Sequence, residues 1–156
     1  VLSNYHTKYK VYQMDANILA KKLKEIDITY IDPPYNQHPY GSNYFMLNII
    51  NDYQLPRETS KVSGIPIDWN RSDYNKKSKA INALNELIES LNSKFVILSY
   101  NSEGLISFDA INALLRKYGQ VRYKEIKYNT FRGSRNLNKR AIHTKEYIFT
   151  LEMFNR

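Results

Sequence analysis

The sequence of 156 residues contains no cysteine. Disulfide bonds, thiolate metal sites and cysteine nucleophiles are therefore excluded, and a reducing cytoplasm is the expected compartment. No apolar run approaches the length that crosses a bilayer, and residues 1–6 lack the basic-then-apolar layout of a signal peptide. Internal repeats and low-complexity linkers are also missing, so we expect one globular domain over residues 1–156 without a membrane contact.

Acidic residues are fewer than basic ones, since the chain has 15 aspartates and glutamates but 23 lysines and arginines, for a formal net charge of +8. This excess favours a polyanionic partner, most simply nucleic acid, although a basic protein without such a partner fits the charge equally well. Hydrophobic residues make up 42% of the chain, which excludes disorder of the whole chain. The 14 tyrosines can stack on bases or pack a core.

Hydrophobic periodicity predicts strands and helices in alternation. Strands are expected at 9–13, 26–31, 95–98, 121–128 and 147–153, and helices at 16–23, 43–51, 78–91 and 107–118. This order predicts an α/β sandwich with a mainly parallel sheet, in which the mostly apolar runs 26–31 and 95–98 are buried strands. The last two strands have no helix between them, so they should form a hairpin that adds one antiparallel strand near the edge of the sheet.

Asp32-Pro33-Pro34-Tyr35 directly follows the apolar strand predicted at 26–31. Open parallel sheets bind ligands just beyond the carboxyl ends of their strands. The prolines stiffen the turn and leave carbonyl groups without competing N–H partners. Asp32 adds a carboxylate acceptor and Tyr35 a flat π face, which together suit the amino group of a planar base. The alternative is a purely structural proline turn, but chance gives this tetrapeptide after an apolar strand in on the order of one chain in a thousand.

The tetrapeptide resembles the catalytic motif of DNA adenine-N6 methyltransferases. Residues 26–50 resemble the stretch around that motif in the adenine methylases of restriction–modification systems. Residues 94–107 resemble their next core strand and loop, and residues 128–140 and 145–152 resemble their final hairpin. The resemblance implies a Rossmann-like methyltransferase fold, S-adenosyl-L-methionine as cofactor and double-stranded DNA as partner.

The chain departs from this family in its glycines, which are Gly41, Gly64, Gly104, Gly119 and Gly133. None of them forms the Phe-x-Gly-x-Gly-like cofactor loop of the family. In the subgroup that segments 43–48 and 99–107 most resemble, this loop lies upstream, whereas in another subgroup it follows the catalytic half. We therefore expect the chain to be the C-terminal part of a longer methyltransferase and to be inactive alone. Without the missing strands, strand 26–31 would have an open edge through which the chain could self-associate.

The resemblance also assigns roles to single residues. Asp32 and the carbonyl of Pro33 would accept hydrogen bonds from the amino group of the target adenine, in a turn that Pro34 stiffens. Tyr35 would stack on the flipped base, so that catalysis is mainly positioning and electrostatics without a covalent enzyme intermediate. Asp15 matches a weaker family position that contacts the adenine of the cofactor. The alternative role for Asp15 is a plain helix N-cap.

The stretch between residues 122 and 145 is strongly basic and contains a loop rich in glycine, serine and asparagine. We expect phosphate contacts from four cations of this loop, Arg132, Arg135, Lys139 and Arg140. Phe131 is a candidate for stacking on a base, and Asn36 is a candidate DNA contact beside the catalytic motif. The alternative is an ordinary solvated charged face. The three histidines have no metal-ligand spacing, so no metal site is expected.

Two other functions stay open at the level of sequence. The same fold could methylate the amino group of cytosine at N4, an RNA base or a protein amide, although an aspartate at the first motif position favours adenine. The chain could also be a non-catalytic, basic nucleic-acid-binding module whose proline turn is structural. Methyl transfer by the full-length protein to adenine-containing duplexes would separate the three.

Overall fold

The computed structural model describes residues 7–62, 64–67, 71–129 and 143–154. These residues form one sheet of four strands in the order β1-β2-β4-β3. The strands are β1 (Ile26–Ile31), β2 (Ser93–Asn101), β3 (Gly119–Asn129) and β4 (His143–Met153). The predicted α/β class is confirmed, but the sheet is mixed rather than mainly parallel, because two of its three ladders are antiparallel.

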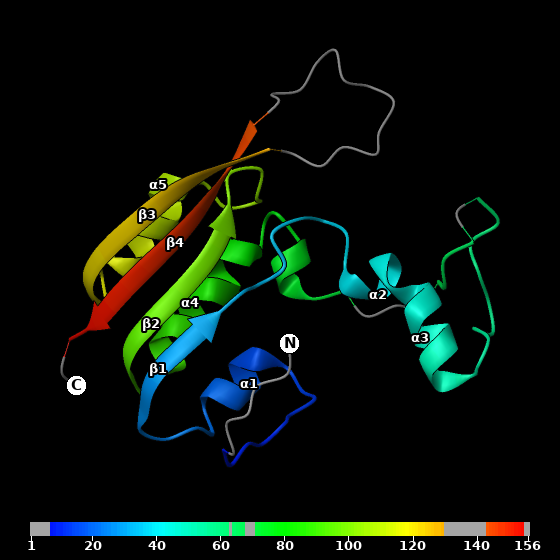
Figure 1. The fold of residues 1–156 in the computed structure, drawn as a ribbon, viewed down its shortest axis with the longest axis horizontal. Coiled ribbons are helices and arrows are strands. Elements are labelled where there is room, and N and C mark those ends of the chain that lie inside the picture. The colour runs from blue at the N-terminus through cyan, green and yellow to red at the C-terminus, as the bar shows by residue number, and fades with distance from the viewer. Residues whose placement is uncertain (1–6, 63, 68–70, 130–142, 155–156) are drawn as a thin grey trace.

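Three of the four strands run in the same direction. β1 pairs with β2 in parallel, whereas β4 pairs antiparallel with both β2 and β3. β3 and β4 therefore form the predicted C-terminal hairpin, and β4 lies between β2 and β3 (Figure 1). Because β4 separates the two strands on either side of it, only the β1–β2 ladder is parallel, although β3 points the same way as β1.

The helices divide into a group beside the sheet and a group in a long connection. The first group comprises α4 (Ala80–Ser90) and α5 (Phe108–Leu115), which pack against the sheet, and α1 (Ala16–Ala20), which packs against α4. The second lies in the connection from β1 to α4 and comprises α2 (Tyr40–Asn43), α3 (Phe45–Asp52) and the 3₁₀ turn η1 (Asp73–Asn75). α2 and α3 extend away from the sheet (Figure 1) and contain no buried residue, whereas η1 packs against α4.

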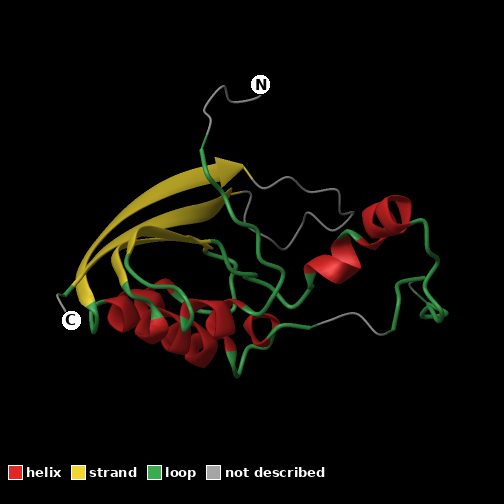
Figure 2. Ribbon diagram, turned by 90° about the horizontal axis from the view of Figure 1, so that it is seen from below, coloured by secondary structure: helices red, strands yellow, loops and turns green. Residues whose placement is uncertain are grey.

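The hydrophobic core lies between one face of the sheet and helices α4 and α5 (Figure 2). Alternate side chains of β2 and β4 point into it, as the period of a strand requires. The largest fully buried side chains are Phe149, Leu84, Ile88, Leu98, Ile111, Leu115, Leu151 and Val96. Burial of this apolar surface is the main stabilising contribution to the fold.

Two predictions about strands are wrong. Residues 9–13 have no regular structure and are exposed, because no strand in the described part of the chain accepts hydrogen bonds from them. β1 is also not buried on both faces, since Ile28 is 59% exposed and Tyr30 is 60% exposed. The reason is visible in Figure 2, where the helices lie against only one face of the sheet.

β1 is one of the two end strands of this sheet, and β3 is the other. The outer edge of β1 has no strand partner among the described residues, as the sequence predicts. An unpaired edge presents backbone N–H and carbonyl groups that can pair with another strand. The sheet therefore leaves the β1 edge unpaired beside the segment 32–35, and the described helices leave one of its faces uncovered.

Candidate functional site

The segment 32–35 leaves the carboxyl end of β1, where the sequence places it. Pro33 is buried and Pro34 is half-buried, whereas Asp32 is exposed. The ring of Tyr35 is 37% exposed. The turn thus presents a carboxylate and an aromatic ring at the surface while the prolines anchor it in the molecule.

Two hydrogen bonds hold the backbone directly after the prolines. The N–H of Leu105 donates to the Tyr35 carbonyl at 2.8 Å. Nδ2 of Asn75 donates to the Asn36 carbonyl at 2.8 Å, and Asn75 is only 4% exposed. Leu105 follows β2 and Asn75 belongs to η1, so two distant segments fix the turn. Sequence reasoning missed both anchors, because nothing local to either residue signals a partner so far along the chain.

Asn36, a predicted DNA contact, has a local structural role. Its Oδ1 accepts a hydrogen bond from the N–H of His38 at 2.8 Å. Its carbonyl receives the bond from Asn75 described above. Asn36 therefore shapes the backbone where the chain leaves the turn 32–35.

The loop after β2 is built to present Leu105 to that turn. Oδ1 of Asn101 accepts the N–H of Glu103 at 2.7 Å, which begins the loop. The hydroxyl oxygen of Tyr100 accepts the N–H of Ile106 at 3.2 Å, which ends it. A Cβ on Gly104 would collide with the Tyr100 ring and lie 2.9 Å from the Asn101 carbonyl. This close approach explains a glycine at that position.

Asp15 is the N-cap of α1, which confirms the second of the two roles that the sequence predicts for it. Its Oδ1 accepts the N–H of Asn17 at 2.9 Å and the N–H of Ile18 at 3.1 Å. Both bonds use the same carboxylate oxygen, so the cap leaves Oδ2 outside these bonds. A helix cap and a ligand contact are therefore compatible roles for this exposed carboxylate.

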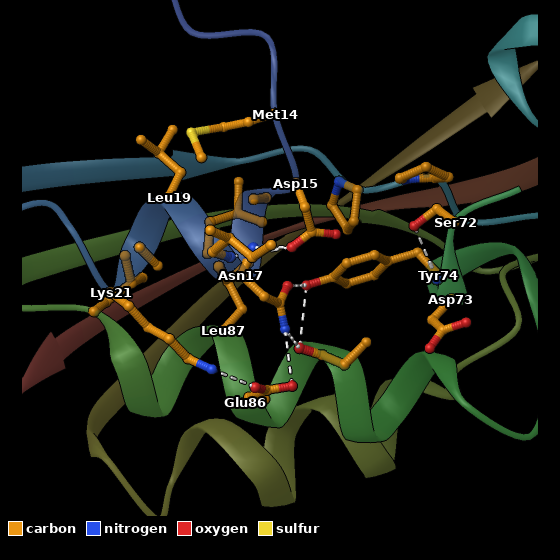
Figure 3. Close-up of a pocket in the computed structure, with 18 of the residues that line it drawn as sticks. Met14, Asp15, Asn17, Leu19, Lys21, Ser72, Asp73, Tyr74, Glu86 and Leu87 are labelled. Carbon is orange, nitrogen blue, oxygen red and sulfur yellow. Dashed lines mark hydrogen bonds and ion pairs between the residues drawn. The ribbon is translucent and has the colours of Figure 1, made fainter. Parts of the chain in front are cut away.

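An open cavity of about 1300 Å³ is lined both by Asp15, the predicted cofactor contact, and by residues of the predicted catalytic turn. It lies between α1, the carboxyl end of β1, η1 and α4 (Figure 3). Asp15 lines one part, and Asp32, Pro33 and Pro34 line another, whereas Tyr35 is outside the lining. The structure therefore brings both carboxylates that the sequence singles out to one cavity.

The cavity fits a cofactor with a purine ring. Ligand pockets typically measure about 300–1,000 Å³, so the space suffices. Ile31, Leu87 and Leu91 supply apolar wall, and Asp15 supplies a carboxylate acceptor for an amino group. This combination of an apolar surface and an anionic acceptor matches an aminopurine.

A cluster of hydrogen bonds lines the cavity between α1, η1 and α4 (Figure 3). The Tyr74 hydroxyl donates to Asn17 Oδ1 at 2.9 Å, with the Ala83 carbonyl 3.1 Å away as an alternative acceptor. Nδ2 of Asn17 donates to the Ala83 carbonyl at 2.9 Å. Glu86 lies 3.4 Å from the same Nδ2 and pairs with Lys21 at 2.7 Å.

Tyr74 is 7% exposed and stays protonated. Burial raises the pKa of its hydroxyl far above the ordinary value, and the negative charges of Asp15 and Glu86 raise this pKa further. The hydroxyl is therefore a hydrogen-bond donor at neutral pH. Sequence reasoning missed this residue, since one tyrosine among 14 carries no distinguishing local signal.

A pair of tyrosines follows the predicted catalytic turn along the chain. The rings of Tyr40 and Tyr44 stack with centroids 5.8 Å apart and planes at 28°. Burial raises the pKa of Tyr40, and the nearby charge of Asp32 raises this pKa further. α2 therefore begins close to the predicted catalytic carboxylate.

The predicted DNA-binding loop is only partly described. Phe131, Arg132, Arg135, Lys139 and Arg140 lie outside the described residues. The structure does describe where the loop begins and ends, since Asn129 of β3 pairs with His143 of β4. Because β3 runs in the direction of β1, its carboxyl end lies at the same sheet edge as Asp32, as the sequence predicts.

Among the described residues, no group of three or more histidine, cysteine, aspartate or glutamate side chains could hold a metal ion. No helix in the same ranges is long and apolar enough to cross a membrane.

Comparison with known proteins identifies relatives along most of the chain. The family model of D12 class N6 adenine-specific DNA methyltransferases matches residues 1–114. Type II methyltransferase M.NlaIII of Neisseria lactamica is 36% identical over 146 residues, which are 92% of this chain and 43% of that protein. Type II methyltransferase M.FokI of Planomicrobium okeanokoites is 35% identical over 154 residues, or 97% of this chain and 23% of that protein.

Modification methylase StsI of Streptococcus sanguinis is 39% identical over 137 residues, or 83% of this chain and 20% of that protein. The chain thus spans less than half the length of these curated relatives. No solved structure matches it significantly.

Proposed function

Because the chain belongs to the D12 class of N6 adenine-specific DNA methyltransferases, we propose that it carries the methyl-transfer chemistry of a longer, site-specific enzyme of this class. The methyl donor is S-adenosyl-L-methionine, and the acceptor is N6 of an adenine flipped out of double-stranded DNA. The sheet is the C-terminal half of a Rossmann-like methyltransferase sheet. The observation that carries the proposal is the single cavity lined by both Asp15 and Asp32.

The catalytic turn acts on the target amino group. Asp32 and the Pro33 carbonyl accept its two N–H bonds, which turns the nitrogen lone pair toward the cavity. The bound cofactor supplies a methyl group on a positively charged sulfur. The carboxylate of Asp32 would stabilise the positive charge that the amine acquires when it takes up this methyl group, until the amine releases a proton to water.

Rigidity of the turn is part of this mechanism. Hydrogen bonds from Leu105 and Asn75 fix the backbone on the far side of the prolines before substrate arrives. Groups held in a reactive geometry need no reorganisation during the reaction, which is the main source of catalysis when no covalent intermediate forms. Tyr35 stacks on the extruded base, and this contact offsets part of the few kcal/mol that extrusion costs.

Asp15 is the residue that would hold the adenine of the cofactor. The carboxylate oxygen that does not cap α1 would accept a hydrogen bond from the amino group of that adenine. Ile31, Leu87 and Leu91 are the apolar wall available to the purine. This arrangement lets one short segment, the start of α1, serve helix capping and cofactor binding together.

Methylation of adenine-containing duplexes by the full-length enzyme tests the proposal. We expect Asp32→Ala to nearly abolish methyl transfer and to leave cofactor binding mostly intact, because it removes an acceptor for the target amine. Asp27→Ala is the matched control, since Asp27 lies near the start of β1, away from the turn, and forms an exposed ion pair with Lys94 at 2.6 Å. Methylated cytosine or RNA in place of adenine would contradict the proposed substrate, and DNA binding without any methyl transfer would indicate a non-catalytic module.

A further inference from the structure

We propose that η1 holds the two halves of the site in register, with Tyr74 positioning Asp15 and Asn75 positioning the catalytic turn. The inference rests on the proposed function for the roles of Asp15 and Asp32. It adds two positioning residues that act through hydrogen bonds to other residues. Neither is assigned a contact with cofactor or DNA.

The link from Tyr74 to Asp15 runs through one residue. The Tyr74 hydroxyl donates to the side chain of Asn17, and the backbone N–H of Asn17 donates to the Asp15 carboxylate. The other end of the Asn17 side chain is held by the Ala83 carbonyl of α4. Asn17 therefore cannot turn without breaking bonds to two other elements.

α1 needs such an external anchor. It has five residues, and a helix this short is not stable by itself in water. Ala20 is its only buried residue. The place of Asp15 in the cavity consequently depends on contacts that α1 makes with α4 and η1, of which the Tyr74 bond is the one from η1.

Asn75, the residue after Tyr74, links η1 to the catalytic turn instead of to α1. Nδ2 of Asn75 donates to the carbonyl of Asn36, directly after the catalytic tetrapeptide. η1 is itself fixed, because the Ser72 hydroxyl oxygen accepts the N–H of Tyr74 at 3.2 Å. Two adjacent side chains of one short turn thus bond to two different segments, Tyr74 to α1 and Asn75 to the backbone that follows the catalytic tetrapeptide.

Burial argues that these bonds are specific. Tyr74 and Asn75 are 7% and 4% exposed, although the neighbouring segment 53–62 is largely exposed. Burying polar groups costs free energy unless they are hydrogen-bonded, and no buried side-chain nitrogen or oxygen in the described ranges lacks a partner. η1 thus buries two polar side chains, one bonded to α1 and the other to the backbone that follows the catalytic tetrapeptide. These two bonds fix the distance between α1 and the catalytic turn.

The proposal predicts that the two variants fail in different steps. In the full-length enzyme, Tyr74→Phe should raise the Kd for S-adenosyl-L-methionine by about three- to tenfold, as the loss of one hydrogen bond implies, with little change in the rate at saturating cofactor. Asn75→Ala should leave that Kd unchanged and slow single-turnover methyl transfer by about 10- to 100-fold, because the turn is misplaced. Calorimetry measures the first quantity and single-turnover methylation the second.

A double-mutant cycle and a control identify the route of the effect. If Tyr74 acts through Asp15, Tyr74→Phe should weaken cofactor binding far less when Asp15→Asn is already present. Tyr118→Phe is the control, because the Tyr118 hydroxyl makes a similar 3.0 Å bond to Asn85 of α4, away from the cavity lining. Tyr118→Phe should lower the melting temperature without changing the Kd for the cofactor or the single-turnover rate. If Tyr74→Phe or Asn75→Ala does not fold, Asn17→Ala and Asn75→Ser test the same two links.

Four results would overturn the inference. Tyr74→Phe and Asn75→Ala could lose cofactor affinity and rate to the same extent, or Tyr118→Phe could show the same losses. Either result would mean that η1 only stabilises the fold. An equal effect of Tyr74→Phe with and without Asp15→Asn would refute the route through Asp15 and leave the proposed function intact. Normal cofactor binding by Asp15→Asn alone would instead refute the proposed role of Asp15, and the Tyr74 link with it.

Discussion

Tyr35 contributes its ring and its backbone to different tasks. Its carbonyl accepts the N–H of Leu105, and this bond survives any side-chain change. Its ring is exposed at the site, where the proposed function has it stack on the flipped adenine. Substitutions of Tyr35 therefore test stacking without removing the anchor of the turn.

We expect Tyr35→Phe to be mild and Tyr35→Ala to be severe, because the ring face matters more than the hydroxyl. Stacking of a base on an aromatic ring is worth about 1–3 kcal/mol. Tyr35→Ala should therefore lower kcat/KM for DNA by a factor that corresponds to a free energy in this range. Single-turnover methylation with both variants measures it. Wild-type turnover in Tyr35→Ala would refute the stacking role.

Asp15 offers a second residue-level test, because its two roles respond to different substitutions. Asparagine caps helices about as well as aspartate but is uncharged. Asp15→Asn should therefore keep the melting temperature and weaken cofactor binding. Asp15→Ala should weaken cofactor binding and also cost about 1 kcal/mol of stability through loss of the cap. Thermal unfolding and calorimetry on the same samples separate the two; a stability loss in Asp15→Asn equal to that in Asp15→Ala would contradict this division.

At the scale of elements, the loop after β2 supports the turn 32–35, which the proposed function makes catalytic. Its glycine lies against the Tyr100 ring, and the next residue, Leu105, donates to the turn. A side chain at Gly104 must displace the ring or the loop. Overpacking of this kind costs about 1–3 kcal/mol.

We therefore expect Gly104→Ala to lower both stability and the rate of methyl transfer, since the displaced loop moves the N–H of Leu105. Gly64→Ala is the matched control. Gly64 has φ of 69° with no atom within 4 Å of an added Cβ, so alanine there should cost about 1 kcal/mol of stability through backbone strain alone. Chemical denaturation and single-turnover rates check both variants. A rate loss in Gly64→Ala as large as in Gly104→Ala would remove the supporting role.

The hairpin loop between β3 and β4 is the second element with a testable task. We expect replacement of its four cations by alanine to weaken binding of the full-length enzyme to every DNA sequence by a similar factor, because phosphate contacts carry little sequence information. Each lost contact should reduce the slope of log K against log salt by about one unit. Salt titrations of DNA binding measure this. Unchanged affinity and slope would identify the loop as an ordinary solvated hairpin.

At the scale of the whole molecule, β1 has an unpaired outer edge in the described part of the chain. One face of the sheet also carries exposed apolar side chains, including Ile28, Tyr30 and Phe95. Exposed apolar patches and open edges are both surfaces for association.

We expect the isolated chain of 156 residues to be inactive, to bind S-adenosyl-L-methionine weakly and to self-associate through β1. Calorimetry and sedimentation velocity test these points. Ile28→Lys with Tyr30→Lys should reduce the association, because charges beside an edge strand oppose pairing. Micromolar cofactor binding by the isolated chain, or a monomer at all concentrations, would contradict this view of its boundaries.

Local chemistry made part of this molecule predictable from sequence. β1 has the bounds that its apolar run predicts, and the prolines end it at Asp32. Asp15 caps α1, and the apolar spacing of 78–91 matches the buried face of α4. Caps, prolines and hydrophobic periods act over one or two turns of chain, so the sequence alone determines them. The family follows from a motif that is equally local.

Tertiary structure alone decided which distant groups meet. Whether 9–13 became a strand depended on a neighbouring strand, and the exposure of Ile28 depended on which face the helices cover. The links from Tyr74 to Asn17 and from Asn75 to Asn36 join residues 57 and 39 positions apart. Hydrogen bonds over such separations form only when folding closes the intervening loops, and no local preference of either residue encodes the partner.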